Sequence, residues 1–476
     1  MFNSITLSAL AYFLVCGGPF GTEELMRTVP YPLVVLCGLI VFPLVYSLPL
    51  ALVCSELATA MPYNSGITMW VKEAFGHFLG FQVGFCVLIT YMLDTSSYPL
   101  LFLSYIEHST SLVHFEPWAL WLIGTALTVV MSLLHLIGLR AIAWSSVILV
   151  ALVFIPCSLF VIFAFPFVDP SVWFSTSGRS SASSVVTLLS SLQEQQLQAD
   201  YSYFLSLLIW HHSGWLSISF LAGEIRAVRT TYPRTMLFTV ILSILTTIVP
   251  LAMLMCVDRT HASYQFGAQW VHAATEITTG GVVGSTNISW LGVLMIIAAM
   301  ASAIGLFNAQ FAASTRGLAH MSAPQMNMLP HVFYYSSYHH LKQQMTKSCG
   351  QTYCCCCCSW NRKQEEEQAI IATPPQQDDT VSPPSPNQQY SPSLYNNSQG
   401  VPIVAIGVQT VLTSLCLLIP MDLLISAQMC IDSVSVIILL LSFIYLRFRR
   451  QDLQRPFRIP LNNLLSMFLC IFPICI

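Results

Sequence analysis

The chain has 476 residues, of which 55 % are hydrophobic and only 8 % carry a charge, and its mean hydropathy is +0.68. Soluble globular domains carry roughly 25 % charged residues, so this composition predicts a membrane protein. The formal net charge of −3 is too small to indicate a nucleic-acid partner or a charged substrate. Any charge that serves a function must therefore be local.

Apolar stretches long enough to cross a bilayer, which takes about 20 residues as a helix, recur along the chain. We expect eleven of them, near residues 4–26, 31–58, 78–105, 116–138, 142–166, 202–225, 235–256, 287–315, 401–420, 423–446 and 459–476. No Lys or Arg precedes Arg27, so the first stretch is expected to be a retained membrane segment rather than a signal peptide. Because backbone groups in lipid must be satisfied internally, we predict an all-α integral membrane protein whose helices pack as a bundle.

The basic residues predict the orientation. If the N-terminus is cytoplasmic, 15 of the 18 Lys and Arg residues fall on the inner side of the membrane. Four of the fifteen lie deep in a long loop, where the positive-inside rule is weak, and the remaining 11 against 3 still favour this orientation.

Residues 325–400 differ in kind from the rest of the chain. They contain "KQEEEQ" and "TPPQQDDTVSPPSPNQQYSPS", and few large aliphatic residues follow His331. Such a segment cannot bury enough apolar surface to fold. We therefore predict a disordered cytoplasmic insert between two groups of membrane helices, 1–324 and 401–476.

Sixteen cysteines are present, and most of them stand alone in apolar segments, where a thiol behaves as a small hydrophobic group. No two CxxC motifs have the separation that a zinc site requires, so we expect neither a bound metal nor a cofactor. Five cysteines are adjacent to one another inside the insert, beside basic residues, and are candidate S-palmitoylation sites. The alternative is a low-complexity expansion without function. These five are Cys354, Cys355, Cys356, Cys357 and Cys358.

The first apolar segment contains residues that disfavour a helix, in the stretch "CGGPFGTEEL". Gly17, Gly18 and Gly21 lower the preference for helix, and Pro19 cannot donate a backbone hydrogen bond. Unwound backbone exposes amide donors and carbonyl acceptors, which can hold a substrate carboxylate and a cation or ammonium group. The alternative is a glycine-lined helix crossing or a simple kink.

The sixth segment, "LLIWHHSGWLSISFLAGEI", is interrupted at His211, His212, Ser213 and Gly214. If segments one to five and six to ten are two halves, each half begins with a broken helix. Because each half has five segments, an odd number, the second half is inverted in the membrane relative to the first. Paired interruptions in corresponding positions of two halves indicate the central site of a transporter. The histidines could titrate near neutral pH, but hydrogen bonding between helices is the simpler role.

Acidic side chains within the membrane are costly and mark either a pathway or a satisfied packing contact. Asp94 lies midway along the third segment among Thr and Ser residues, where it could pair with a cationic substrate group or carry a proton. Glu23 and Glu24 follow the first break, and a water-filled outer vestibule is the alternative setting for one of them.

Two further acids lie at the predicted inner ends of segments. Glu56 ends the second segment and Glu224 ends the sixth. This placement suits gating or structural ion pairing better than substrate contact. We expect Arg226 or Arg229 to be the partner of Glu224.

Five stretches of the sequence match motifs of one known family. "GGPFGTEEL" is similar to a first-helix GGPFG-x-E-[DE] motif, and "LIVFPLVYSLPLALVCSELATAMPYNSGITMWVKEAFG" to the second helix and following loop. "LDTSSYPLLFLSYI" is similar to a third-helix signature, while "SFLAGEIRAVRTTYPRTM" and "PFRIPL" resemble the end of the sixth helix and the entry to the eleventh. Together they resemble the amino acid–polyamine–organocation superfamily, and within it the polyamine and amino-acid uptake permeases of plants and trypanosomatids. The resemblance covers nearly the whole chain apart from the insert.

This resemblance implies a five-plus-five inverted-repeat fold and alternating access. It further implies secondary uptake of amino acids or polyamines, coupled to protons, with the plasma membrane as the expected location. The implied substrate site comprises Gly17, Gly18, Phe20, Gly21, Asp94, Tyr98, Ser213, Gly214 and Trp215. Glu23 and Glu24 match family positions and are expected to serve coupling or gating, as is Glu224 because of its place at the inner end of the sixth segment.

The sequence departs from the family pattern at several acidic positions. Plant relatives have an acid where this chain has Leu216, a Glu where it has Asn308, and tenth-helix acids where it has Gln428 and Leu439. A site for a polycation needs several carboxylates, so these departures weaken the polyamine hypothesis and favour an amino acid with a neutral or singly charged side chain. Relatives also normally have a twelfth helix, whereas this chain stops within the eleventh segment, which predicts a truncated or divergent product.

The sequence thus favours a secondary transporter whose partners are a small-molecule substrate, protons and the lipid bilayer. A nutrient receptor built on a transporter fold is the alternative, and it would bind its ligand without transport and signal through the insert. An intramembrane enzyme is not favoured, because the sequence contains no nucleophile–base pair or HExxH-like metal motif.

Overall fold

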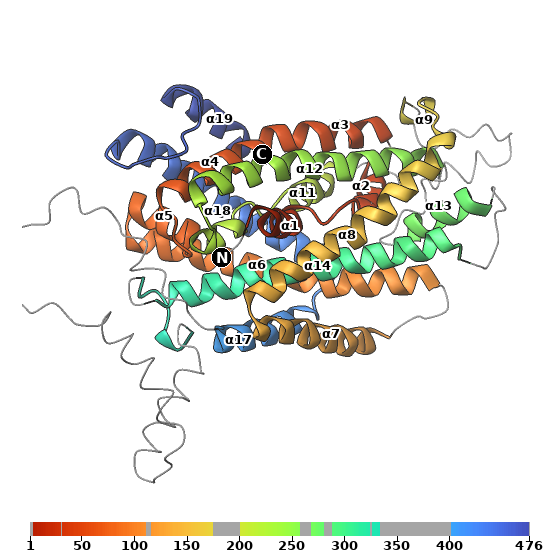
Figure 1. The fold of residues 1–476 in the computed structure, drawn as a ribbon, viewed down its shortest axis with the longest axis horizontal. Helices are drawn as coiled ribbons and strands as arrows, with labels where there is room; N and C mark the ends of the chain where they lie inside the picture. The colour runs from red at the N-terminus through yellow and green to blue at the C-terminus, as the bar shows by residue number, and fades with distance from the viewer. Residues whose placement is uncertain are drawn as a thin grey trace, which may run out of the picture.

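The computed structural model describes residues 3–29, 31–110, 116–174, 200–257, 268–279, 288–323, 326–333 and 401–475 (Figure 1). These ranges form helices joined by turns and loops, and they contain no β-strand. Within them, seven helical segments are long and apolar enough to cross a membrane, and three shorter apolar helices accompany them. The prediction of an all-α membrane bundle is confirmed.

Each of the eleven predicted segments contains helix. The first five are α1 (Ser4–Val15) with α2 (Glu23–Thr28), α3 (Pro32–Phe42) with η1 (Pro43–Ser47) and α4 (Leu48–Ala60), α6 (His77–Thr110), α7 (Pro117–Ile137), and α8 (Leu139–Ala164) with η2 (Phe165–Phe167). The next six are α11 (Tyr201–His211) with η4 (Ser217–Glu224), α12 (Val228–Val257), α14 (Trp290–Met321), α17 (Ile403–Cys416), α18 (Met421–Arg449) and α19 (Asn463–Cys475). The shorter connecting helices are α5 (Gly66–Phe75), α9 (Ser171–Phe174), α13 (Ala268–Thr279) and η5 (His331–Phe333).

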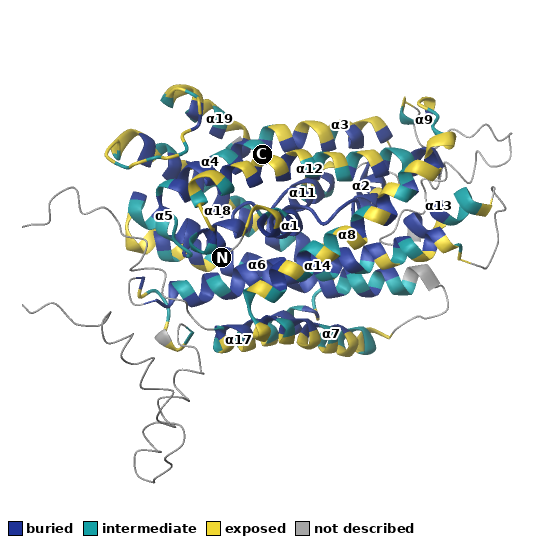
Figure 2. Ribbon diagram, viewed as in Figure 1, coloured by how far each residue is buried: buried dark blue, intermediate teal, exposed yellow. Residues whose placement is uncertain are grey.

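The first helix lies inside the bundle. α1 packs against α8, α12 and α14, while α14 also packs against α6, which in turn contacts α18. Of these helices, α1 and α14 are largely buried, whereas α8, like α3 and α7, carries exposed faces (Figure 2). The exposed positions of α7 include large aliphatic side chains, such as Val130 at 65 % and Ile137 at 73 % exposure. Such faces suit contact with lipid tails, because apolar side chains are stable in hydrocarbon.

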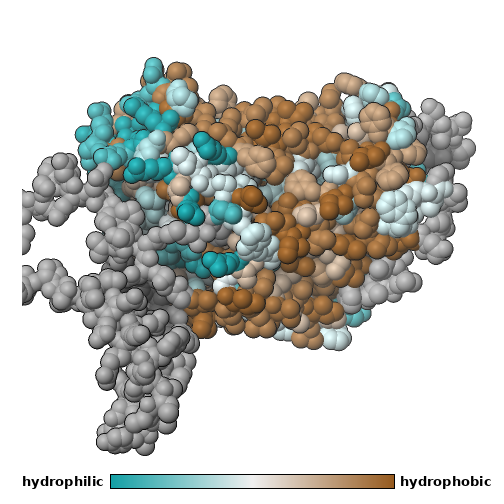
Figure 3. Space-filling view, viewed as in Figure 1, coloured by the Kyte–Doolittle hydropathy of each residue, from teal (hydrophilic) through white to brown (hydrophobic). Residues whose placement is uncertain are grey.

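Polar side chains gather at one end of the molecule. Hydrophilic residues surround α5 and the α18–α19 connection, next to a broad band of hydrophobic residues over the helices (Figure 3). This end holds Lys72 on α5 and the arginines that follow α18, whereas α2, α9 and α13 lie at the opposite end (Figure 1). An apolar band with a polar end fits a bundle that spans a membrane. The cytoplasmic position of the N-terminus stays a prediction.

The predicted insert begins within the described residues. The N–H groups of Met328 and Leu329 donate to the Met321 carbonyl at 3.1 and 3.3 Å, and Phe333 packs against the end of α14. The first residues after α14 therefore still belong to the packed structure. Residues 334–400, with the predicted palmitoylation run, lie outside the described residues, and the division of the chain into domains stays a prediction.

Candidate functional site

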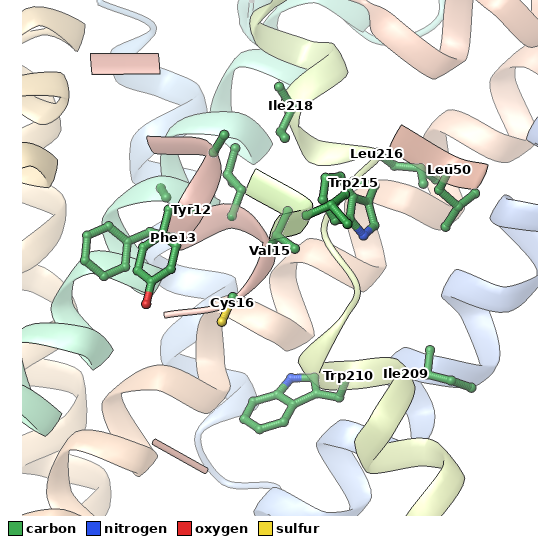
Figure 4. Close-up of a cluster of buried hydrophobic side chains, with 14 of the residues drawn as sticks. Tyr12, Phe13, Val15, Cys16, Leu50, Ile209, Trp210, Trp215, Leu216 and Ile218 are labelled. Carbon is green, nitrogen blue, oxygen red and sulfur yellow. The ribbon is translucent and has the colours of Figure 1, made fainter. Parts of the chain in front are cut away.

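The two interrupted helices meet at their breaks. Between α1 and α2 the backbone unwinds at Gly17, Gly18 and Gly21, whose φ angles are +84°, +111° and +90°. Between α11 and η4, Gly214 has a φ of +85°. A Cβ atom at Gly214 would overlap the carbonyl oxygen of Leu14, so the second break packs its backbone directly against the end of α1. Side chains from both segments surround this contact (Figure 4).

A third helix, α14, holds the first break in place. The hydroxyl of Ser302 donates to the Gly17 carbonyl at 2.6 Å. A Cβ atom at Gly17 would lie 2.7 Å from Cδ1 of Leu306 and 2.9 Å from the Ser302 hydroxyl, so a larger residue would displace α14 side chains. Gly17 lies beyond the end of α1, so its carbonyl is outside the hydrogen-bond pattern of that helix. It accepts its hydrogen bond from a neighbouring helix instead.

Asp94 on α6 is a buried carboxylate, 4 % exposed. Its Oδ2 accepts a hydrogen bond from the Tyr98 hydroxyl at 2.7 Å, one turn further along α6. Its Oδ1 accepts from Nε1 of Trp210 on α11 at 3.2 Å, and the Gln428 side chain on α18 is a further partner. All of these partners are neutral. No cationic side chain in the described ranges pairs with this carboxylate.

Asp432 on α18 is a second buried acid that the sequence reasoning missed. It is 4 % exposed, and it interacts electrostatically with Asp94, Tyr46 and Tyr91. Nothing in the described part of the chain forms a hydrogen bond or ion pair with its carboxylate. The sequence does contain this sign: an Asp in the interior of the 29-residue α18. Only Gln428 and Leu439 were considered as positions for acids on that helix.

Glu23, just after the first break, is fully buried. Its Oε2 accepts from the Gly21 N–H at 2.7 Å and from Nε1 of Trp270 at 2.9 Å, while its Oε1 accepts from the Tyr105 hydroxyl at 3.1 Å. The ring of Phe20 contacts the rings of Tyr105 and Trp270, with a centroid distance of 5.8 Å in each case. Glu23 therefore joins α2 to α6 and α13 and is shielded from solvent.

Glu24, the next residue, has different surroundings. It is 1 % exposed, it forms an ion pair with Arg27, and it lines a cavity of about 680 Å³ between α2, α6, α7 and the α17–α18 connection. Of the two acids that follow the first break, Glu24 is thus the one that faces a cavity.

At the end of the bundle opposite α2, two arginines form ion pairs with a buried glutamate. Glu56 on α4 is fully buried and pairs with Arg447 of α18 at 2.8 Å and with Arg455 at 3.1 Å. Its Oε2 also accepts from the Ile459 N–H at 2.9 Å. This ion-pair cluster connects α4 to α18 and to the chain that leads into α19. It agrees with the structural pairing expected for Glu56.

The prediction that Arg226 or Arg229 pairs with Glu224 is wrong. Ala227 has a φ of +53°, and the turn there leaves Arg226 and Arg229 exposed. Glu224 instead forms an ion pair with Arg316 on α14. The pair joins the end of the sixth segment to the eighth, which sequence spacing could not reveal.

Near the second break, Trp210 rather than Trp215 donates a hydrogen bond to the Asp94 carboxylate. Trp215 is fully buried, and its Nε1 has no hydrogen-bond partner among the described residues. In Figure 4 its indole lies apart from the ring of Trp210. The hydroxyl of Ser213 donates to the Trp210 carbonyl at 2.9 Å, which links the break back to α11.

The two histidines of the second break lie in packed surroundings. A ring nitrogen of His212 lies 2.9 Å from the Leu208 carbonyl, and its ring contacts Phe42 with a centroid distance of 5.6 Å. His211 packs against the first break, where a Cβ atom at Gly21 would lie 3.1 Å from its Cε1. The histidines therefore fill space between helices, and the hydrogen bond of His212 stays within α11 instead of joining two helices as expected.

Proteins with similar sequences are named as transporters. A probable polyamine transporter of Arabidopsis thaliana is 29 % identical over 69 % of the chain, and the polyamine transporter PUT1 of Oryza sativa subsp. japonica is 29 % identical over 70 %. These matches span only 63 % and 56 % of the relatives' own lengths, which is less than two thirds. An uncharacterized transporter of Legionella pneumophila is 35 % identical over 20 % of the chain and 21 % of its own length.

A family model described as amino acid permease matches residues 10–476. The match includes both broken helices, the two buried acids and the α18–α19 connection. Nearly the whole length of the chain is covered, and the chain therefore belongs to the amino acid permease family.

Proposed function

We propose that this protein is a secondary active transporter that imports amino acids or polyamines by alternating access, with protons as the coupling ion. Its membership in the amino acid permease family supports transport, as do plant relatives that are named as polyamine transporters. The same proposal places the protein in the plasma membrane with its N-terminus in the cytoplasm.

The observation that carries the proposal is a pair of buried acids: Asp94, which accepts a hydrogen bond from Trp210 just before the second break, and Asp432, which interacts electrostatically with Asp94. Buried carboxylates are unfavourable unless a cation compensates their charge. An ammonium group of a bound substrate would supply that cation. The unwound backbone of residues 16–22 offers amide groups for a substrate carboxylate, as in other broken-helix sites. The site therefore suits organic amines with or without a carboxylate.

Asp432 also changes the expected substrate within that class. The loss of acids at the tenth helix argued against a polycation, and Asp432 returns an acid to that helix. Two carboxylates favour a substrate with more than one positive charge. We therefore place polyamines and basic amino acids ahead of amino acids with neutral side chains.

Alternating access requires contacts that open in turn at the two ends of the bundle. At one end, the bonds of Glu23 to Tyr105 and Trp270 join α2 to its neighbours. At the other end, the ion pair of Glu224 with Arg316 joins η4 to α14. We propose that these two sets of contacts act as gates, and that Asp94 or Asp432 carries the coupled proton.

Uptake into proteoliposomes tests this proposal. Labelled putrescine, arginine and leucine are offered with and without an inward proton gradient. We expect accumulation of putrescine or arginine that depends on the gradient and is lost in Asp94→Asn and Asp432→Asn. The surface variant Asp452→Asn removes an equivalent charge from an exposed loop and should transport normally. If none of the three compounds accumulates, the proposal is wrong.

The receptor alternative rests on residues 325–400, nearly all of which lie outside the described residues. It predicts binding without transport, and a loss of signalling but not of binding when residues 332–399 are deleted. Gradient-driven uptake by that same deletion variant would contradict it.

A further inference from the structure

The connection between α18 and α19 brings three arginines together around two acceptors. Arg447 and Arg455 both pair with the buried carboxylate of Glu56, at 2.8 and 3.1 Å. Arg447 and Arg458 both donate to Oδ1 of Asn463, at 3.1 and 3.3 Å. Because each arginine shares an acceptor with another, the three guanidinium groups form one group, which we call the arginine cluster.

The folded chain fixes most of the arginine cluster. The side chain of Arg447 is 2 % exposed, and its guanidinium also donates to the Ile459 carbonyl at 3.2 Å. The side chain of Arg455 is 11 % exposed. Arg458 is the exposed member, and its hydrogen bond among the described residues goes to the neutral amide of Asn463. The cluster is therefore anchored in the bundle and reaches the surface at Arg458.

The arginines of this connection outnumber the acids that pair with them. Within the described ranges those acids are Glu56, Glu73 and Asp452, and the last two both pair with Arg450. In this part of the chain Glu56 is therefore the one acid paired with the cluster. The five arginines of the connection are Arg447, Arg449, Arg450, Arg455 and Arg458. Both counts, three against one and five against three, leave an excess of two positive charges that an anion would offset.

The cluster lies where the polar end of the bundle meets its apolar band (Figure 3). Directly after Asn463, Leu464 and Leu465 of α19 are 61 % and 51 % exposed, and Phe468 is 52 % exposed. Arginines near the ends of membrane helices reach toward the lipid headgroups, while such apolar side chains contact the lipid tails. Because α19 begins at Asn463, the positive end of its helix dipole also lies at the cluster. An anion held here would be at the level of the headgroups.

The chemistry of this place suits the phosphate of an anionic phospholipid. A guanidinium group presents N–H donors in a fixed fork that matches phosphate oxygens. The excess of positive charge disfavours a zwitterionic headgroup, because its ammonium group would be repelled. The exposed side chains of α19 offer apolar surface to acyl chains, which a soluble phosphate does not have.

We propose that the arginine cluster binds the headgroup of an anionic phospholipid, with Arg458 as its exposed contact and the acyl chains along α19. The bound phosphate offsets the excess charge of the cluster and so strengthens the link between α4, α18 and α19. This site belongs to the boundary between protein and membrane, and it does not depend on the proposed transport activity.

Binding of radiolabelled dioleoylphosphatidylglycerol to the full chain in dodecyl maltoside micelles tests the proposal. We expect saturable binding of one lipid molecule per chain. Arg458→Gln should weaken this binding at least about tenfold, because a charge-assisted contact to phosphate is lost. Arg458→Lys keeps the charge without the fork and should weaken it only about threefold.

The matched control is Arg449→Gln, which removes the same charge from the same connection. Arg449 is exposed, and it shares neither Glu56 nor Asn463 with the cluster, so its loss should change the binding less than about twofold. If the two Arg→Gln variants weaken binding equally, the lipid is attracted by the charged surface as a whole, and the site is overturned. Thermal unfolding in detergent shows whether the variants are folded. Should Arg458→Gln not fold, Asn463→Asp adds a negative charge to the cluster and should weaken the binding in its place.

Competition distinguishes the sources of the phosphate group. We expect unlabelled phosphatidylglycerol to displace the label, and phosphatidylcholine with the same acyl chains and inorganic phosphate to leave it bound. If inorganic phosphate competes as well as the lipid, the ligand is a soluble phosphate and the proposal is overturned. If phosphatidylcholine competes equally, the acyl chains alone account for the binding, and the cluster has no part in it.

Discussion

The two broken helices are interrupted in similar ways but are held by different forces. The first break is held by hydrogen bonds from other helices, such as that of Ser302 to the Gly17 carbonyl and those that converge on Glu23. The second break is held mainly by steric contact, since Gly214 packs against the Leu14 carbonyl. One break is therefore a polar junction and the other a close packing of backbone on backbone.

This difference indicates how the two breaks can move. A hydrogen bond from a side chain can open and be replaced, whereas a backbone contact without room for a Cβ atom leaves no space for sliding. We infer that the two breaks move together as one unit during transport. The bonds from α6, α13 and α14 to the first break are then the ones that open and close. The predictions below test this division of roles.

The largest effect is expected for Gly214→Ala. The new methyl group meets a backbone carbonyl and also requires a left-handed φ, so we expect a loss of about 3 kcal/mol in the free energy of unfolding. The matched control is Gly76→Ala, where φ is +91° but no atom lies within 4 Å of the added Cβ. That variant should lose only about 1 kcal/mol, from backbone conformation alone. Denaturation of the purified protein in detergent measures both, and equal losses would contradict the packing role.

The next effect is expected for Glu23→Gln. The carboxylate accepts three hydrogen bonds from neutral donors, and the amide cannot accept all of them, so about 2 kcal/mol of stability should be lost. Glu24→Gln is the control, because Glu24 pairs with the half-exposed Arg27, and such a pair contributes about 1 kcal/mol or less. Thermal unfolding of the two variants would decide, and a larger loss for Glu24→Gln would reverse the assignment.

A smaller effect is expected for Ser302→Ala, which leaves the Gly17 carbonyl without its partner on α14. We expect a loss of about 1 kcal/mol, the typical contribution of one buried hydrogen bond. Ser314→Ala is the control on the same helix, because the one bond of the Ser314 hydroxyl among the described residues goes to the Phe311 carbonyl, one turn away. The control should lose less. If both variants unfold alike, the hydroxyl of Ser302 does not hold the first break.

The smallest effect is expected for Trp210→Phe, measured as transport rather than stability. The substitution removes one of the neutral donors to Asp94, and we expect the apparent KM for the transported amine to change about fourfold. Trp215→Phe removes an indole N–H without a partner among the described residues, so its KM should stay the same. A larger change for Trp215→Phe would favour Trp215, which the family resemblance assigns to the substrate site, over Trp210.

Several features of this protein could be read from the sequence. The eleven apolar segments all contain helix, because an apolar run of membrane length has no other way to satisfy its backbone. The first break was located at Gly17 and the second at Gly214, since glycine is the residue that tolerates a positive φ. Asp94 and Tyr98 were both expected at the substrate site, and in the structure a hydrogen bond joins them across one helical turn.

Other features were beyond the sequence because they depend on how helices are rotated and packed. Trp210 and Trp215 lie on either side of the second break, and only the unwinding between them decides which indole reaches Asp94. Arg316 is 92 positions from its partner Glu224, so no local pattern connects them.

What the sequence determined by itself is the membrane class, the helices and the places where two of them break, since these follow from local hydropathy and backbone preference. What only the tertiary structure decided is which side chains meet at those breaks. Asp432 becomes significant through its interaction with Asp94, and Glu23 differs from Glu24 because Tyr105 and Trp270 bond to Glu23 whereas Arg27 pairs with Glu24. The physical reason is that the energetic effect of a buried charge depends on the groups around it, and here these groups come from helices far apart in the chain.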